Sequence, residues 1–412
     1  MRPGRNLFLL YVLAAIIAPI VIYDASTQLF DFVVYHHAGR AFIEGQGPLY
    51  GPESGLGWPQ YFRYPPLFLV LFVPFAMLPA QVSAAVWAML KLVVLYFLVR
   101  ALARRMDFPR AGYWWLAPTL MAGPFLVQEF RCGNVQFFIF ALVTGALLTL
   151  ERRPWLAAFF LAAGASLKVW PLFFVPYVAA RCRLRVAALT LAMVAGLTLL
   201  PAVFLGWQRH ADLLGQWATQ EWKTGSLEAE VWYPSQSLGG VMQRYLTAVD
   251  YSQWPDQNYR DVHFLTLDSR VVRGIWAVLA ASGYLGLLLL ARATASSTGW
   301  LEHALAFCAL PLLQPFAHRI IFVVLLWPAL VAGVLLMRHR ALSVWSRAML
   351  CAAVVVLALQ PLVPGSQAQR LFQVIGVDFW ATCLLAIALL SVWVRRKPLE
   401  TLVQDSQSKT PM

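Results

Sequence analysis

Charged side chains are scarce in this chain of 412 residues. Only 12% of the residues are charged, 60% are hydrophobic, and the mean hydropathy is +0.65. A water-soluble core could not bury so much apolar surface. Apolar runs long enough to cross roughly 30 Å of hydrocarbon recur along the chain, and helices satisfy their own backbone groups in lipid. The sequence therefore predicts an all-α polytopic membrane protein.

Signatures of nucleotide and metal chemistry are also missing. The sequence has no P-loop, no glycine-rich dinucleotide turn, no Asp-x-Asp pair for a metal-bound nucleotide sugar and no His-Glu-x-x-His metal site. Its five cysteines are scattered, with neither metal-type nor paired spacing. We therefore expect no metal and no other cofactor.

Acidic residues are few, 19 against 32 Lys and Arg, which gives a net charge of +13. In a soluble protein this balance would suggest nucleic acid, but here arginine clusters cap apolar segments, as the positive-inside rule expects. The clusters assigned to the cytoplasm fall within residues 100–110, 152–153, 181–185, 338–340 and 395–397. The main periplasmic loops are then 24–64 and 207–270, and no nucleic-acid partner is expected.

This orientation predicts a multi-pass protein of a bacterial inner membrane, with about twelve transmembrane helices and both termini in the cytoplasm. Residues 1–394 are predicted to form a single integral membrane domain, and residues 395–412 a cytoplasmic polar tail. The apolar stretch 7–23 is expected to be a retained helix, because no small-x-small cleavage site precedes Asp24.

Three apolar segments are too short to cross the membrane alone. Residues 65–79 are short and bounded by proline, so they are predicted to be a partial or interfacial element. Residues 155–167 and 171–180 are interrupted at Lys168. Broken helices at membrane depth are tolerated where they line a protein cavity, so this break predicts a pocket.

The first periplasmic loop carries a carboxylate in a helical pattern. Read with a 3.6-residue period, residues 30–42 predict a short amphipathic helix on the membrane surface, with Asp31 and Tyr35 on one face. A carboxylate at this depth could abstract a proton from an acceptor hydroxyl. A helix-capping or solvent-exposed aspartate remains the alternative interpretation.

Polar side chains also interrupt the apolar sequence further on. Residues 128–136 place two charges and three amides between two membrane segments, as either a structural hydrogen-bond cluster or a sugar or phosphate site. Lys168 could bind phosphate or could extend to the lipid headgroups. Lys91 lies within an apolar run, where extension to the headgroups or helix pairing explains it equally well.

Two further regions could contact a sugar or a phosphate. The 207–270 loop contains nine Trp and Tyr residues among carboxylates and amides, a composition that suits sugar rings but also a loop lying on a membrane. His318 and Arg319 stand at a predicted periplasmic helix end. Arginine suits a pair of phosphate oxygens, and histidine could bind phosphate or assist proton movement.

Taken in order, these segments resemble family 87 glycosyltransferases of the GT-C superfamily. The resemblance covers residues 24–330. It rests on Asp31-Phe32-Val33-Val34-Tyr35, Tyr64-Pro65-Pro66, Gly133-Asn134-Val135-Gln136, Lys168-Val169-Trp170-Pro171, Ser235-Gln236-Ser237-Leu238 and Gln314-Pro315-Phe316-Ala317-His318. Two positions depart from the family pattern: the amides are exchanged in the Asn134 segment, and Ser235 stands where asparagine would be expected before Gln236.

The resemblance implies a GT-C-type fold, with periplasmic amphipathic helices in the first loop, and the activity of a hexosyltransferase. The donor would be a polyprenyl-monophosphate sugar, most commonly mannose, and the acceptor a periplasmic lipid or glycan, with inversion to an α-linkage. Asp31 would be the general base. The expected phosphate ligands are Lys168, His318, Arg319 and Arg131, and the expected substrate contacts are Tyr35, Tyr64, Asn134, Gln136 and Gln236.

Other functions remain open at this point. An arabinofuranosyltransferase would use the same type of donor. A transporter or flippase for a lipid-linked sugar predicts symmetric repeats and charges near the bilayer midplane, whereas the unusual residues here lie near predicted periplasmic helix ends. An O-antigen-ligase-like enzyme would carry a large loop rich in Arg and His, but residues 207–270 contain eight acidic and five basic residues. A non-catalytic scaffold is a further alternative.

Overall fold

The computed structural model describes residues 3–51, 54, 61–106, 116–225, 234–253, 259–294, 299–338, 342–360, 363 and 365–407. These residues form helices joined by turns and loops, which agrees with the predicted all-α fold. The chain divides into two compact units. The first comprises residues 1–113, 125–231 and 288–296, and the second comprises residues 114–124, 232–287 and 297–412.

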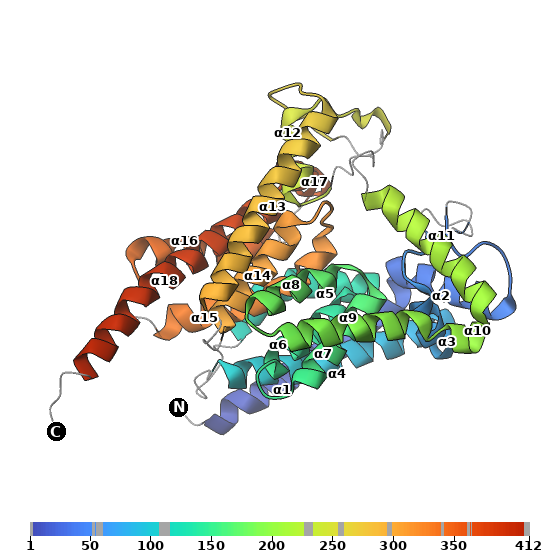
Figure 1. Cartoon of the computed structure of the whole chain (residues 1–412), viewed down its shortest axis with the longest axis horizontal. Coiled ribbons are helices and arrows are strands. Elements are labelled where there is room, and N and C mark those ends of the chain that lie inside the picture. The colour runs from blue at the N-terminus through green and yellow to red at the C-terminus, as the bar shows by residue number, and fades with distance from the viewer. Residues whose placement is uncertain are drawn as a thin grey trace. The chain divides into compact units, whose positions relative to one another are not determined.

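Most of the helices up to residue 225 belong to the first unit. They are α1 (Pro3–Gln28), α2 (Phe30–Glu44), α3 (Pro66–Ala76), α4 (Ala80–Arg105), the C-terminal part of α5 (Leu116–Cys132), α6 (Gln136–Thr149), α7 (Pro154–Leu167), η3 (Trp170–Phe173), α8 (Phe174–Ala180), α9 (Leu184–Leu199), α10 (Ala202–Leu205) and α11 (Trp207–Gly225). Helix α7 packs between α6 and α9, and the three run side by side in Figure 1.

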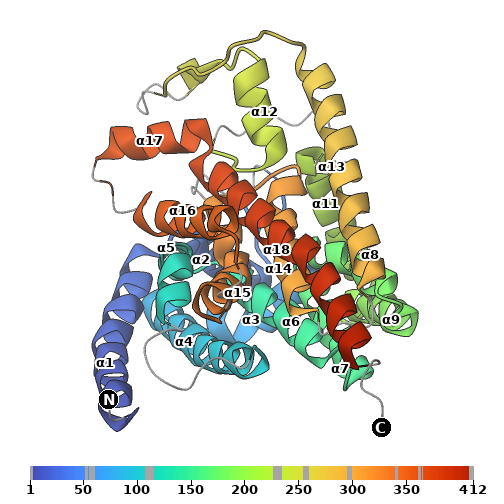
Figure 2. The same ribbon diagram turned by 90° about the vertical axis from the view of Figure 1, so that its left-hand side faces the viewer.

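The second unit contains the remaining helices. They are α12 (Leu238–Leu246), η4 (Tyr251–Gln253), most of α13 (Ser269–Ala293), α14 (Trp300–Leu313), η6 (Arg319–Leu325), α15 (Leu326–Arg338), α16 (Val344–Leu359), α17 (Ser366–Ile375) and α18 (Val377–Gln407). Helix α18 packs along α14 and α16, while α17 runs in a different direction, as Figure 2 shows. Gly376, with φ of +82°, makes the bend between α17 and α18.

Five helical segments in the described part of the chain are long and apolar enough to cross a membrane, or six if the bent pair α1 and α2 counts as one span. Six more apolar helices have only 10–17 residues. A helix of 14 residues rises about 21 Å, less than the roughly 30 Å of a bilayer core. The structure therefore supports a multi-pass membrane protein but does not confirm the predicted count of about twelve spans.

The short segments lie where the sequence predicts them. Helix α3 ends at Ala76, and the chain between α7 and η3 breaks at Lys168, which has an extended backbone. Pro154 occupies the first turn of α7, where its missing N–H leaves no donor unsatisfied. Arg110, Arg340 and the parts of the 207–270 loop at 226–233 and 254–258 lie outside the described residues.

An aromatic core holds α2 against α3 and α4 in the first unit. Phe32 contacts Phe72 and Trp87, with ring centroids 5.6 and 6.2 Å apart, and is fully buried. Phe72 stacks in turn on Phe68 at 5.4 Å. Burial of several large rings on one face of α2 fixes the orientation of that helix. The core therefore determines where the adjacent residue, Asp31, can point.

Candidate functional site

Asp31 occupies the first turn of α2 and is partly buried. Leu29, two residues before Asp31, adopts a left-handed backbone with φ of 52°. Helices α1 and α2 meet at this residue with a bend of 58°. The Nδ2 of Asn134 donates a hydrogen bond of 2.7 Å to Oδ2 of Asp31. The predicted general base and a predicted substrate contact are thus direct partners, although 103 residues separate them.

The turn that presents Asn134 joins α5 to α6. Gly133 has φ of +69°, and a Cβ there would lie 2.6 Å from Cβ of Phe32, so the turn approaches α2 closely. The backbone N–H of Gln136 donates to Oδ1 of Asn134 at 3.0 Å. The Oε1 of Gln136 accepts from Nε1 of Trp170 at 2.7 Å. A continuous series of hydrogen bonds therefore links α2, this turn and η3.

Lys168 supplies a cation to the same region. Its Nζ lies 5.3 Å from the ring centroid of Tyr64. The Tyr64 hydroxyl pairs with the Tyr35 hydroxyl at 2.7 Å, and both tyrosines are at most 5% exposed. The two tyrosines therefore form part of the buried wall, and Lys168 lies over it while acting electrostatically on Asp31.

Burial raises the pKa of the Asp31 carboxyl above its ordinary value, while the hydrogen bond from Asn134 and the charges of Lys168 and Lys91 act in the opposite direction. The titratable groups that interact electrostatically with this carboxyl are Lys91, Lys168, Glu129, Cys132, Tyr35 and Tyr64. A carboxyl with a raised pKa binds protons more strongly, which improves its capacity as a general base.

Helix α11 fixes the loop that carries Tyr64, a contribution that the sequence did not reveal. Glu221 accepts two hydrogen bonds from Arg63, at 3.0 and 3.1 Å. Gln220 donates to the backbone oxygen of Phe62 at 2.9 Å, and Trp217 donates to that of Arg63 at 3.3 Å. The hydrophobic and polar pattern of α11 indicates an amphipathic helix, but no local pattern shows which loop it contacts.

Arg131 lies away from this set of hydrogen bonds. Its Nε is 3.4 Å from Oδ2 of Asp24, and both side chains are more than a third exposed. In the first unit the structure thus brings together Asp31, Asn134, Gln136, Tyr35, Tyr64 and Lys168, whereas Arg131 forms a surface ion pair.

The other predicted ligands belong to the second unit. Gln236 is 1% exposed and donates from Nε2 to the backbone oxygens of Pro234 and Gln373, at 3.0 and 2.8 Å. Arg319 lies 3.4 Å from the buried Asp378 carboxylate and also bonds Gln360. His318 is exposed and packs against the ring of Phe316. In this unit Gln236 and Arg319 therefore hold helices and loops together.

Arg244 is a buried residue that sequence reasoning did not single out. Its guanidinium donates to the backbone oxygens of Val374 and Ser235, both at 2.7 Å. The adjacent Tyr245 donates to the backbone oxygen of Ile375 at 2.8 Å. Helix α12 therefore fixes the C-terminal end of α17. An arginine in a polar loop gives no local signal that it will be buried.

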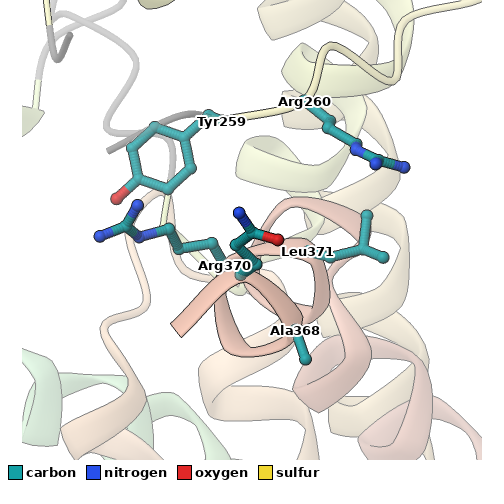
Figure 3. A pocket seen from close by; sticks show the side chains of 6 residues that line it. Tyr259, Arg260, Ala368, Arg370 and Leu371 are labelled. Atoms are coloured by element: carbon teal, nitrogen blue, oxygen red, sulfur yellow. The ribbon is translucent and has the colours of Figure 1, made fainter. Parts of the chain in front are cut away.

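A groove of about 480 Å³ lies in the second unit between the 259–260 segment and α17. Figure 3 shows the Tyr259 ring beside the Arg370 side chain, while Arg260 points away from both. Gln367, Ala368 and Leu371 complete the lining. The two guanidinium groups give the groove a positive character, and none of the predicted site residues lines it.

The family model described as glycosyltransferase family 87 matches residues 62–302, more than half of the chain. The chain belongs to this family. This membership confirms the family predicted from the sequence and, with it, the enzyme class of glycosyltransferase. The matched range includes Tyr64, Arg131, Asn134, Gln136, Lys168 and Gln236, whereas Asp31, His318 and Arg319 lie outside it.

Curated relatives of this family 87 chain come from mycobacteria. A polyprenol-phosphate-mannose-dependent alpha-(1-2)-phosphatidylinositol mannoside mannosyltransferase of Mycobacterium tuberculosis is 29% identical over 59% of this chain and 61% of its own length. The protein of the same description in Mycolicibacterium smegmatis is 25% identical over 52% of both chains. The match thus spans about half to three fifths of these relatives.

One solved structure also aligns with the chain. ArnT from Cupriavidus metallidurans, determined bound to undecaprenyl phosphate, aligns over 92% of this chain and 77% of its own, with 14% sequence identity and a TM-score of 0.42.

Among the described residues, no group of three or more His, Cys, Asp and Glu side chains is arranged to hold a metal ion.

Proposed function

We propose that this family 87 chain transfers a hexose, namely mannose, from a polyprenyl-monophosphate sugar to a hydroxyl of a lipid or glycan acceptor. The observation that carries the proposal is the Asp31 carboxylate, held by Asn134 at 2.7 Å in the same region as Lys168. The names of the mycobacterial relatives support a polyprenol-phosphate-mannose donor.

Asp31 acts as the general base. It removes the proton of the acceptor hydroxyl while the oxygen bonds to the anomeric carbon and the bond from that carbon to the phosphate oxygen breaks. Attack from the face opposite the phosphate converts a β-linked donor into an α-glycoside. The hydrogen bond from Asn134 leaves the other carboxylate oxygen, Oδ1, for the acceptor proton.

The phosphate leaves with its negative charge and needs a cation rather than a proton. Lys168 is the first choice for this role because it lies in the same region as Asp31. Arg131 and Arg319 each pair with a carboxylate, so binding phosphate would require them to exchange partners. His318 is exposed, and we keep it as a proposed phosphate ligand.

The proposed location is a bacterial inner membrane, with the Asp31 region on the periplasmic side. The arginine clusters next to apolar segments support this orientation through the positive-inside rule. The donor would then diffuse in the outer leaflet of that membrane, and the acceptor would be a component of the cell envelope.

The test is sugar transfer by purified protein in nanodiscs, from synthetic polyprenyl-phosphate-mannose to fractionated envelope lipids and glycans. Asp31→Asn keeps the size of the side chain and removes its basicity, so we expect a loss of roughly 100- to 10,000-fold in rate. Glu44→Gln is the matched control, because Glu44 lies at the far end of α2 and pairs at the surface with Arg40.

Three other outcomes are informative. Equal transfer by the wild type and Asp31→Asn would reject Asp31 as the base. Transfer only from polyprenyl-phosphate-arabinofuranose would replace the hexose by a pentose. Movement of the lipid-linked sugar across the membrane without any transfer would identify a transporter and contradict the proposed chemistry.

A further inference from the structure

A buried ion pair lies behind the turn that carries Asn134. Lys91 of α4 and Glu129 of α5 are both 0% exposed, and Nζ of Lys91 lies 2.8 Å from Oε2 of Glu129. The Nζ also donates to the backbone oxygen of Glu129 at 3.3 Å and lies 5.2 Å from the ring centroid of Phe130. A fully buried ammonium does not reach the lipid headgroups, so helix pairing accounts for Lys91.

Buried ion pairs are poor sources of stability, because desolvation offsets the attraction of the charges. Apolar residues of similar volume often replace such a pair without loss of stability. The structure of the turn shows what this pair does in addition to joining two helices.

Glu129 holds both ends of the turn between α5 and α6. Its Oε1 accepts a hydrogen bond of 2.9 Å from the backbone N–H of Phe137, in the first turn of α6. Its backbone oxygen accepts from the N–H of Asn134 at 3.2 Å. Lys91 occupies the other carboxylate oxygen and so fixes the orientation in which Oε1 faces Phe137.

The orientation of the Asn134 amide follows from this arrangement. Its Oδ1 accepts from the backbone N–H of Gln136, so Nδ2 faces Asp31 and donates to it. A shift of the turn would therefore remove the hydrogen bond from Asn134 to Asp31. A Cβ added at Gly133 would lie 2.6 Å from Cβ of Phe32, so the turn is already close to α2 and has little room to move toward it.

We propose that Lys91 and Glu129 are positioning residues that hold the 133–136 turn, so that Asn134 orients the Asp31 carboxylate for proton abstraction. The inference rests on the proposed function of Asp31 as the base. Neither residue of the pair touches substrate. Its effect reaches the carboxylate through Phe137 and Asn134, and the charge of Lys91 adds a direct electrostatic contribution.

Two double variants separate positioning from charge and from packing. The Met/Leu variant, Lys91→Met with Glu129→Leu, removes the ion pair and also the acceptor for the N–H of Phe137. The Met/Gln variant, Lys91→Met with Glu129→Gln, removes the same charges but keeps an amide oxygen for that N–H. Both variants are neutral at these positions, so a difference between them reports the hydrogen bond to Phe137.

We expect the Met/Leu variant to fold and to lose roughly 10- to 100-fold in kcat, because small displacements of a reacting group cost rates of this order. The Met/Gln variant should retain most of the wild-type kcat. The KM for the donor should change little in either variant, because neither position contacts the donor.

The pH profile gives a readout that a purely structural role would not change. Loss of the Asn134 hydrogen bond raises the pKa of Asp31, so the acid limb of kcat/KM moves to higher pH. The Met/Leu variant should show this shift relative to the Met/Gln variant, which lacks the same charges. Asn134→Ala in the Met/Gln background should reproduce the shift, and Asn134→Ala added to the Met/Leu variant should cause no further shift. The other groups that act on Asp31 stay unchanged: Lys168, Cys132, Tyr35 and Tyr64.

Hydrogen exchange tests the same inference without any assay of transfer. In the Met/Leu variant, amide exchange of residues 134–137 should accelerate at least about tenfold relative to the Met/Gln variant. Equal exchange in the two variants would overturn the proposal, as would equal loss of kcat in both. Absence of transfer by the wild type would contradict the proposed function alone, since the exchange result stands independently.

Discussion

Gly133→Ala is a sharp test of the close approach between the 133–136 turn and α2. The substitution adds one methyl group at a residue with φ of +69°, and its Cβ would lie 2.6 Å from Cβ of Phe32. That neighbour cannot rotate away, because a Cβ is fixed by its backbone and Phe32 is fully buried against Phe72 and Trp87.

Two contributions set the size of the effect. A left-handed backbone costs a non-glycine residue about 1–2 kcal/mol. Forcing an extra group into a packed region costs about 1–3 kcal/mol. The substitution should therefore destabilise the first unit by roughly 2–5 kcal/mol, which corresponds to a fall of roughly 5–15 °C in Tm.

The assay is thermal unfolding of the purified protein in detergent, followed by sugar transfer at a temperature where the variant is folded. We expect transfer to fall roughly 100-fold, because Asn134 follows directly and orients Asp31. Gly196→Ala is the matched control. Gly196 lies within α9, is exposed and has no atom within 4 Å of an added Cβ, so alanine there should leave Tm unchanged or raise it slightly.

A Tm of Gly133→Ala within about 2 °C of the wild type would refute this reasoning, since the expected destabilisation exceeds that shift several-fold. It would mean that the turn can move away from Phe32 at little cost. The hydrogen bond between Asn134 and Asp31 would then have to tolerate the same displacement.

Two further predictions concern pH and the second unit. Because burial raises the pKa of Asp31, activity should be lost as pH falls through a value above the ordinary aspartate pKa of about 4, which a pH profile of kcat/KM measures. A limb at or below that value would contradict the burial of this carboxyl. Arg319→Gln should destabilise the second unit by about 3–5 kcal/mol, because it leaves the Asp378 carboxylate buried without its charge partner. Adding Asp378→Asn to the Arg319→Gln variant should restore part of the lost Tm, because the buried charge is then removed. A raised KM for the donor with an unchanged Tm would instead favour phosphate binding by Arg319.

The sequence by itself determined the all-helical membrane class, because apolar composition and segment length depend on no tertiary contact. It also located the helix at Asp31 and the break at Lys168, since helical period and proline act locally. The order of the motifs was sufficient to identify the family. The predicted number of spans, by contrast, depends on how six short apolar helices lie in the bilayer.

Only the tertiary structure decided which polar residues are partners. Asp31 bonds Asn134, and Glu129 bonds both Lys91 and the turn before α6, across separations of up to 103 residues. The tertiary structure also separated two predicted phosphate ligands: Lys168 lies near Asp31, whereas Arg319 pairs with a buried carboxylate. Such pairings arise when helices pack and desolvated polar groups must find partners, and local sequence carries no record of which segments will meet.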